Sequence, residues 1–249
     1  MYFVQKEEAG LRRNNIDITF WIIILLLAGI SLKGGAFNDP MQWVMDKMLL
    51  LPAIVIGISF HEFAHAAVAY KLGDSTPKLQ GRVTVNPLSH IDWMGLAALF
   101  FVGFGWGVPV EINPHNFKKI RRDEFLVAIA GVTMNLIIAI IFAVICKFAV
   151  MFASQWLFGT TMGMGLWQIL VYIIQINLVL MIFNLIPVPP LDGFNIIAQI
   201  FGFGQSEIYW KIYSYGSWIL IAIIVLGIAG MIISPLVGWM FAMLTLFIF

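Results

Sequence analysis

The chain has very little cysteine and very little charge. Its single cysteine, Cys146, excludes a disulfide within the chain and any cysteine-based zinc site, and its place in an apolar run favours a packing role. Only 11% of the 249 residues are charged, whereas soluble proteins carry about a quarter. The net charge of +1 gives no reason to expect a nucleic-acid partner. The sequence also lacks a long polar stretch in which a separate soluble domain would fold.

Apolar sequence is abundant instead. Hydrophobic residues make up 61% of the chain, in long runs separated by short polar segments. The candidate membrane-spanning runs lie near 18–32, 48–72, 124–153, 165–186 and 212–249. The last run is expected to break near Ser234-Pro235 into one full span and one short one. We therefore predict an all-α polytopic membrane protein with about five to six transmembrane helices in the lipid bilayer.

The short polar segments carry signals for orientation. Lys6, Arg12 and Arg13 precede the first apolar run, so the positive-inside rule places the N-terminus in the cytoplasm. That run lacks a convincing small-residue cleavage site, which favours a retained signal-anchor helix over a removed signal peptide. The loop at 111–123 carries the strongest basic cluster of the chain and is expected on the same side.

Residues 73–110 do not fit simple membrane helices. Glycine and proline interrupt residues 73–93, and polar and apolar residues alternate from Arg82 to Asn86, which predicts a strand or small β-hairpin. The apolar segment at 94–110 is rich in glycine. With cytoplasmic flanks on both sides, this segment is expected to enter the membrane and return as a re-entrant segment.

One motif places two histidines and a glutamate inside the 48–72 run: His61-Glu62-Phe63-Ala64-His65. Histidines at i and i+4 lie on one face of a helix, so both imidazoles can bind a single metal ion. Glu62 can then take a proton from an attacking water, as in zinc hydrolases. Ionisable groups at membrane depth are costly and mark a functional site. The alternative makes both histidines hydrogen-bonded packing residues, and a third ligand would decide between the two.

Asp192 is the best candidate for that third ligand. It is the only carboxylate between Glu124 and Glu207, and it follows three prolines at 187–190 that must end the preceding helix. Bent backbone at membrane depth is tolerated where it is buried in protein or lines a wet cavity. Two histidines and one aspartate would leave a fourth zinc position open, which is typical of catalytic sites. The alternative role is a helix-capping aspartate.

Three motifs together resemble one known family. The H-E-x-x-H helix is followed by N-x-x-P-x-P-x-L-D-G at Asn184–Gly193, and G-x-x-x-N occurs at Gly131–Asn135. The combination resembles the site-2 protease family of intramembrane zinc metalloproteases over residues 48–195. Residues 82–92 and the later Gly-Trp-Gly at 105–107 resemble the compact branch without PDZ domains. Val132 stands where many relatives have proline, which bears on a helix kink there but not on metal chemistry.

The resemblance implies a three-helix core that holds one zinc ion per chain within the bilayer. The implied reaction is hydrolysis of a peptide bond within or near the transmembrane segment of a membrane protein substrate. By matching position, the expected zinc ligands are His61, His65 and Asp192. Glu62 is by the same comparison the expected general base.

Two asparagines also match family positions near the site. Asn135 and Asn184 are expected to bind substrate backbone or the oxyanion, with hydrogen bonding between helices as the alternative role. The expected organisation is an N-terminal signal-anchor helix and connector (1–47), the metalloprotease core (48–195) and C-terminal transmembrane helices (196–249). We expect a multi-pass protein of the cell membrane, in a bacterial plasma membrane.

The residues alone leave two other functional classes open. Another membrane H-E-x-x-H class takes its third ligand from a glutamate on a later helix, for which Glu124 and Glu207 are the candidates. A non-catalytic zinc-binding or transport protein is the second class. Glu62 argues against it, because a binding site does not need a base beside its ligand. His90 can approach the zinc, although a polar turn residue is the favoured role.

Overall fold

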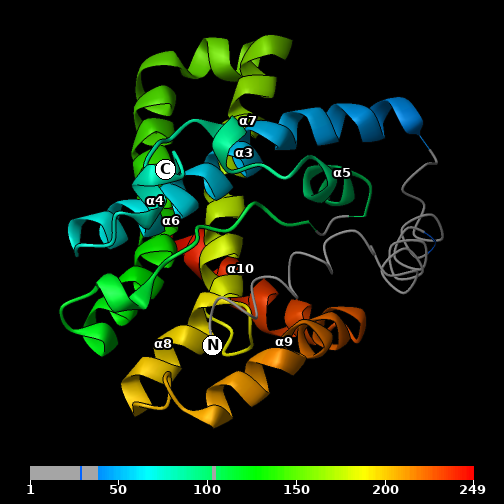
Figure 1. Cartoon of the computed structure of the whole chain (residues 1–249). Coiled ribbons are helices and arrows are strands. Elements are labelled where there is room, and N and C mark those ends of the chain that lie inside the picture. The colour runs from blue at the N-terminus through cyan, green and yellow to red at the C-terminus, as the bar shows by residue number, and fades with distance from the viewer. Residues whose placement is uncertain (1–28, 30–38, 103–104) are drawn as a thin grey trace. The chain divides into compact units, whose positions relative to one another are not determined.

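The computed structural model describes residue 29, residues 39–102 and residues 105–249 (Figure 1). The signal-anchor helix expected near 18–32 therefore lies outside the described residues, apart from Gly29. The chain divides into two units, residues 1–44 with 93–106 and residues 45–92 with 107–249. Every residue predicted for the site belongs to the second unit.

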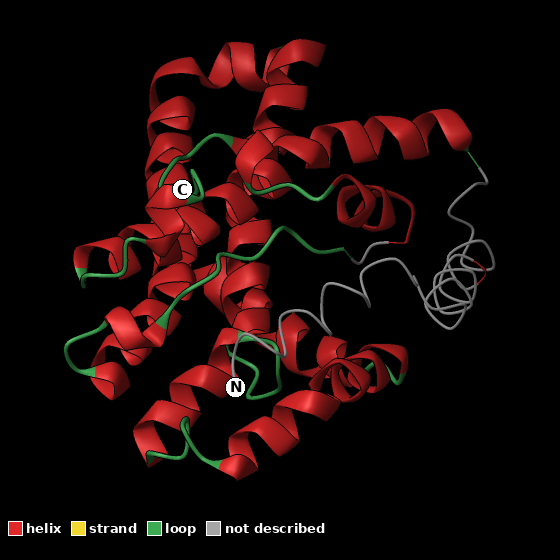
Figure 2. Cartoon of the chain, viewed as in Figure 1, coloured by secondary structure: helices red, strands yellow, loops and turns green. Residues whose placement is uncertain are grey.

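Five described helices are long and apolar enough to cross a membrane. They are α3 (Pro40–Lys71), α6 (Ile120–Gly159), α7 (Thr161–Asn184), α9 (Glu207–Val225) and α10 (Ile228–Ile248). The shorter elements are α4 (Thr76–Leu79), η1 (Pro87–Ser89), α5 (Trp93–Val102), η2 (Pro114–Asn116) and α8 (Asp192–Phe201). Figure 2 shows helices and loops throughout the described residues. The predicted all-α, multi-pass class is confirmed.

The expected break at Ser234-Pro235 is wrong. Pro235 lies inside α10, where the membrane helix continues through it, as membrane helices tolerate proline. The chain instead breaks at Gly227, whose φ of +74° is the left-handed conformation that ends α9 and precedes α10. Helix α6 extends beyond its expected end at 153, but Ala153 departs from helical backbone angles and marks a kink.

The predicted β-hairpin at 82–86 is also wrong, because no strand occurs among the described residues and the nearest pairing is a single bridge between Ile91 and Gly107. Polar side chains fold this loop on itself instead. The Asn86 side chain accepts a hydrogen bond from the Leu88 amide at the start of η1, and Arg82 donates to the Ser89 carbonyl.

The re-entrant segment expected over 94–110 is not supported. Residues 93–102 form the short helix α5, and the described residues from 105 to 111 are not helical. A ten-residue helix is about 15 Å long, half the hydrocarbon thickness of a bilayer. Glycine-rich apolar sequence therefore indicated the break in the helix, but not a path into and out of the membrane.

Helices α3, α6 and α7 pack directly on one another. Ala53 of α3, Ile138 of α6 and Ile173 of α7 share one buried cluster. A second cluster joins α6 and α7 to α10, and it includes Cys146, which is fully buried as the sequence predicted. A third joins α6 and α7 to α8 through Ile196. Each cluster contains at least one buried alanine, and these short side chains let the helices approach closely.

Asp74 ties the end of α3 to the loop before α6. Its carboxylate is fully buried and accepts hydrogen bonds from Thr76, from the Asn113 amide and from the Asn116 side chain, at 2.6–3.0 Å. Burial raises the pKa of Asp74, but these hydrogen bonds lower it by more and hold it below its ordinary value. The contact helps fix α3, which carries the H-E-x-x-H motif, against α6.

Candidate metal centre

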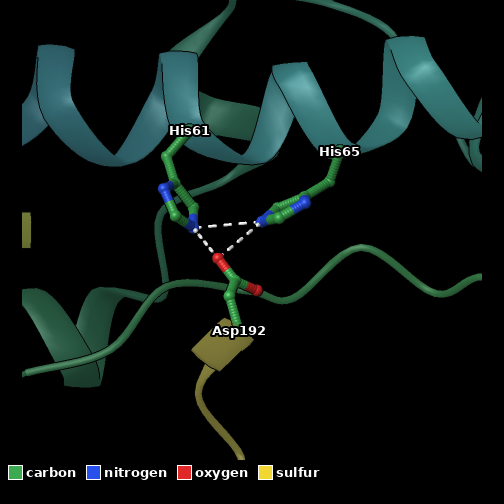
Figure 3. A group of neighbouring side chains, drawn as sticks. All are labelled: His61, His65 and Asp192. Atoms are coloured by element: carbon green, nitrogen blue, oxygen red, sulfur yellow. Dashed lines mark hydrogen bonds and ion pairs between the residues drawn. The ribbon is translucent and has the colours of Figure 1, made fainter. Parts of the chain in front are cut away.

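The two motif histidines present their rings on one face of α3. His61 and His65 are both 7% exposed, and their Nε2 atoms lie 3.1 Å apart (Figure 3). The i, i+4 spacing on a regular helix accounts for this proximity.

Asp192 reaches the same point from the other side. Helix α7 ends at Asn184, the chain turns through its prolines, and Asp192 is the first residue of α8. Its Oδ2 lies 3.2 Å from His61 Nε2 and 3.3 Å from His65 Nε2 (Figure 3). The turn is tight because a Cβ on Gly193 would lie 2.3 Å from the Leu185 carbonyl oxygen.

The far nitrogen of each histidine faces an oxygen. His61 Nδ1 lies 2.7 Å from Asn135 Oδ1, and His65 Nδ1 lies 2.7 Å from the Val127 carbonyl. Both oxygens can only accept, so each Nδ1 carries a proton, and each ring turns its Nε2 toward Asp192, where that atom can serve as a metal ligand. Such outer partners fix the orientation of metal-binding histidines.

This donor set fits zinc. Two imidazole nitrogens and a carboxylate oxygen converge within 3.1–3.3 Å, and among the described residues Oδ2 has no partner other than these two nitrogens. When both Nε2 atoms are unprotonated, three lone pairs so close repel one another unless a metal cation lies between them. Ligand atoms around tetrahedral zinc lie about 3.4 Å apart, given bonds of about 2.0–2.2 Å. Among the described residues no other group of three His, Cys, Asp or Glu side chains could hold a metal ion.

Comparison with known proteins identifies the family. Residues 49–227 match peptidase family M50. The chain belongs to this family. It is 37% identical over 205 residues to "Putative zinc metalloprotease YwhC" of Bacillus subtilis, covering 78% of this chain and 92% of that one. It is 27% identical over 183 residues to "Putative zinc metalloprotease Rip2" of Mycobacterium tuberculosis, covering 69% and 67%.

A third relative is "Zinc metalloprotease MJ0392" of Methanocaldococcus jannaschii, 23% identical over 185 residues, with 74% of this chain and 41% of the relative covered. No solved structure matches the chain. The family and these relatives confirm the resemblance: the protein is a site-2-type intramembrane zinc metalloprotease.

Glu62 and the two predicted asparagines have different surroundings in the M50 protease. The Glu62 carboxylate is half-buried and accepts a hydrogen bond from the Val110 amide at 3.2 Å. Asn135 is fully buried. Its side-chain amide accepts a hydrogen bond from His61 and donates to the Gly57 carbonyl and to Asn177. The Asn184 side chain is half-buried at the end of α7 and donates to the Leu180 carbonyl.

The glutamates of the alternative metalloprotease class lie elsewhere. Glu124 accepts hydrogen bonds from Gln199 and Gln205, and Glu207 is exposed at the start of α9. Neither belongs to the metal group. His90 also lies outside it, in a turn where its Nε2 is 2.7 Å from the Thr84 carbonyl.

Sequence reasoning missed two neighbours of the site. Asn177 of α7 is fully buried and hydrogen-bonded to Asn135. An asparagine in the middle of the mostly apolar helix α7 was the available signal, because a buried amide needs a partner. Gly131 of α6 lies against both histidines, and a Cβ there would be 2.4 Å from His65 Nε2. The G-x-x-x-N motif marked that position without indicating its contact.

Proposed function

We propose that His61, His65 and Asp192 hold the catalytic zinc of this protease and that Glu62 is its general base. The observation that carries the ligand assignment is the convergence of three ligand-type atoms, two imidazole nitrogens and a carboxylate oxygen, on one point inside the helical core. Glu62 follows His61 directly and interacts electrostatically with His65. Its other contact, from the Val110 amide, holds one carboxylate oxygen in place.

Zinc, when bound, supplies the Lewis acidity that polarises a scissile carbonyl and lets water attack at neutral pH. Glu62 accepts the proton of the attacking water and delivers it to the leaving amine. His61 and His65 donate their Nδ1 protons to fixed oxygens, which keeps both Nε2 atoms aimed at the metal. Asp192 contributes the one negative charge of the ligand set.

The proposed substrate is the transmembrane segment of another membrane protein. A peptide bond inside a helix is protected by the helix's own hydrogen bonds, so the segment must unwind locally before attack. Asn184 is our candidate for binding the unwound backbone, because it lies where α7 ends and the turn toward Asp192 begins. Asn135 has its amide committed to three partners, which favours a role in orienting His61. We retain residues 48–195 as the catalytic core.

Replacing Asp192 with Asn tests the ligand set. An amide is a much weaker zinc ligand than a carboxylate and removes the neutralising charge, so purified D192N is expected to lose most of its zinc and its activity. Metal content of the purified protein and cleavage of co-expressed, tagged single-span membrane proteins are the measurements. Stoichiometric zinc in D192N would place the third ligand elsewhere.

We also propose that the N-terminus and the basic loop before α6 face the cytoplasm. In a Cys146→Ser background, single cysteines replace the exposed Lys118, before α6, and the exposed Met162, after it. An impermeant thiol reagent on intact cells is expected to label the Met162→Cys variant and to reach the Lys118→Cys variant only after the membrane is opened. The opposite pattern would reverse the orientation.

A further inference from the structure

A chain of buried hydrogen bonds links the metal centre to α7. Asn177 Nδ2 donates to the Ile173 carbonyl at 2.8 Å, and Asn135 Nδ2 donates to Asn177 Oδ1 at 2.9 Å. Asn135 Oδ1 then meets His61 Nδ1 at 2.7 Å. We propose that Asn177 is a positioning residue of the protease, which acts through Asn135 to orient His61 and thereby tightens zinc binding. The proposal rests on the proposed ligand set.

The Ile173 carbonyl, at the end of this series of hydrogen bonds farthest from the metal centre, determines which atoms donate and which accept along it. The Ile173 carbonyl can only accept, so it takes the amide NH₂ of Asn177 and turns the Asn177 oxygen toward Asn135. That oxygen and the Gly57 carbonyl, 3.2 Å away, occupy both protons of the Asn135 amide. Asn135 is left with only its oxygen for His61. His61 is therefore held with its Nδ1–H toward Asn135, which fixes the orientation of the ring and turns Nε2 toward His65 and Asp192.

The two histidines differ in how they are held. His65 is fixed by a backbone carbonyl, Val127, which no substitution removes. His61 depends on side chains alone, and these come from α6 and α7. Loss of Asn177 would leave one Asn135 proton unsatisfied in a fully buried position, and rotation of that amide would then present the wrong atom to His61.

The helices approach closely enough for this chain because Gly57 has no side chain. A Cβ on Gly57 would lie 2.6 Å from Leu180 Cδ1 and 3.6 Å from Asn177 Oδ1. Helix α7 thus crosses α3 one turn before His61, and Asn177 lies at that crossing. The position of α7 therefore affects the orientation of His61, the proposed ligand on α3, through Asn177 and Asn135.

Three variants separate positioning from packing. Asn177→Leu removes both hydrogen bonds. Asn177→Ser is the variant less liable to misfold, since a helical serine can still bond the carbonyl four residues earlier but is too short to reach Asn135. In Asn177→Asp the buried carboxyl is neutral, so it can donate to Ile173 and accept from Asn135 as the amide does.

The measurement is chelator competition for zinc on the zinc-loaded, full-length protein in detergent. N177L and N177S are expected to weaken zinc binding about tenfold, the lower end for loss of an outer partner, whereas N177D stays close to wild type. Gln168→Leu is the matched control. It deletes another side-chain hydrogen bond of α7, the one between Gln168 and Tyr172, which is not part of the series that links Asn177 to His61. Wild-type zinc affinity in N177L and N177S would overturn the proposal, even if both variants melt earlier.

A double-mutant cycle tests the route through Asn135. In an Asn135→Leu background, the further change Asn177→Leu is expected to cost no additional zinc affinity, because the link to His61 is already broken. Additive losses would show that Asn177 acts independently and would refute the relay. His61→Ala is measured in parallel: retention of zinc by that variant would defeat the ligand set itself, a result distinct from any behaviour of Asn177.

Discussion

Replacing Glu62 with Gln is expected to abolish peptide hydrolysis while the protein keeps its zinc. The amide is nearly isosteric with the carboxylate, so it can still receive the hydrogen bond from the Val110 amide through its oxygen. It cannot accept the proton of the attacking water. General-base catalysis contributes about a hundredfold to ten-thousandfold to rate, so we expect a loss of that size in cleavage by the purified protease.

Glu207→Gln is the control for this experiment. Glu207 is an exposed carboxylate at the start of α9, outside the metal group, and its removal should leave cleavage unchanged. Zinc content should be the same in wild type, E62Q and E207Q. Cleavage by E62Q at the wild-type rate would require a different base, whereas loss of zinc from E62Q would give Glu62 a role in metal binding.

The convergence of His61, His65 and Asp192, the proposed ligand set, could be predicted from sequence because its causes are local. The i, i+4 spacing of His61 and His65 fixes their common face on any helix, and the prolines at 187–190 end α7 wherever that helix packs. Asp192, an isolated carboxylate after such a break, was then the natural partner. These inferences needed no knowledge of how the helices are arranged.

The surroundings of the ligands depend on helix packing, which is not local. Helices α6 and α7 are apolar on nearly every face, so sequence periodicity does not show which residues meet α3. Asn177 and Gly131 became significant only when the crossing of α3, α6 and α7 was known. The predicted β-hairpin at 82–86 was wrong for another reason. Hydrogen bonds from side chains to the backbone compete with strand pairing, and in this loop they replace it.

Gly131 carries the second large expected effect. A Cβ at this position would lie 2.4 Å from His65 Nε2 and 2.7 Å from His61 Nε2, the atoms proposed to bind zinc. Neither ring can move away freely, because the Nδ1 atoms are held by Val127 and Asn135. Gly131→Ala is therefore expected to weaken zinc binding at least tenfold and to remove activity with it.

Helix propensity alone would make Gly131→Ala stabilising, so a loss of zinc affinity in this variant cannot be explained by a weaker helix α6. Alanine stabilises the middle of a helix by about 1 kcal/mol relative to glycine, so α6 itself should gain from Gly131→Ala. Gly159→Ala, on the same helix, is the matched control, since a Cβ there would have no neighbour within 4 Å. Chelator competition should show wild-type zinc affinity in G159A and a large loss in G131A. Equal affinity in both would mean that the histidines shift to accept a side chain, and that α6 does not set the space available to the metal.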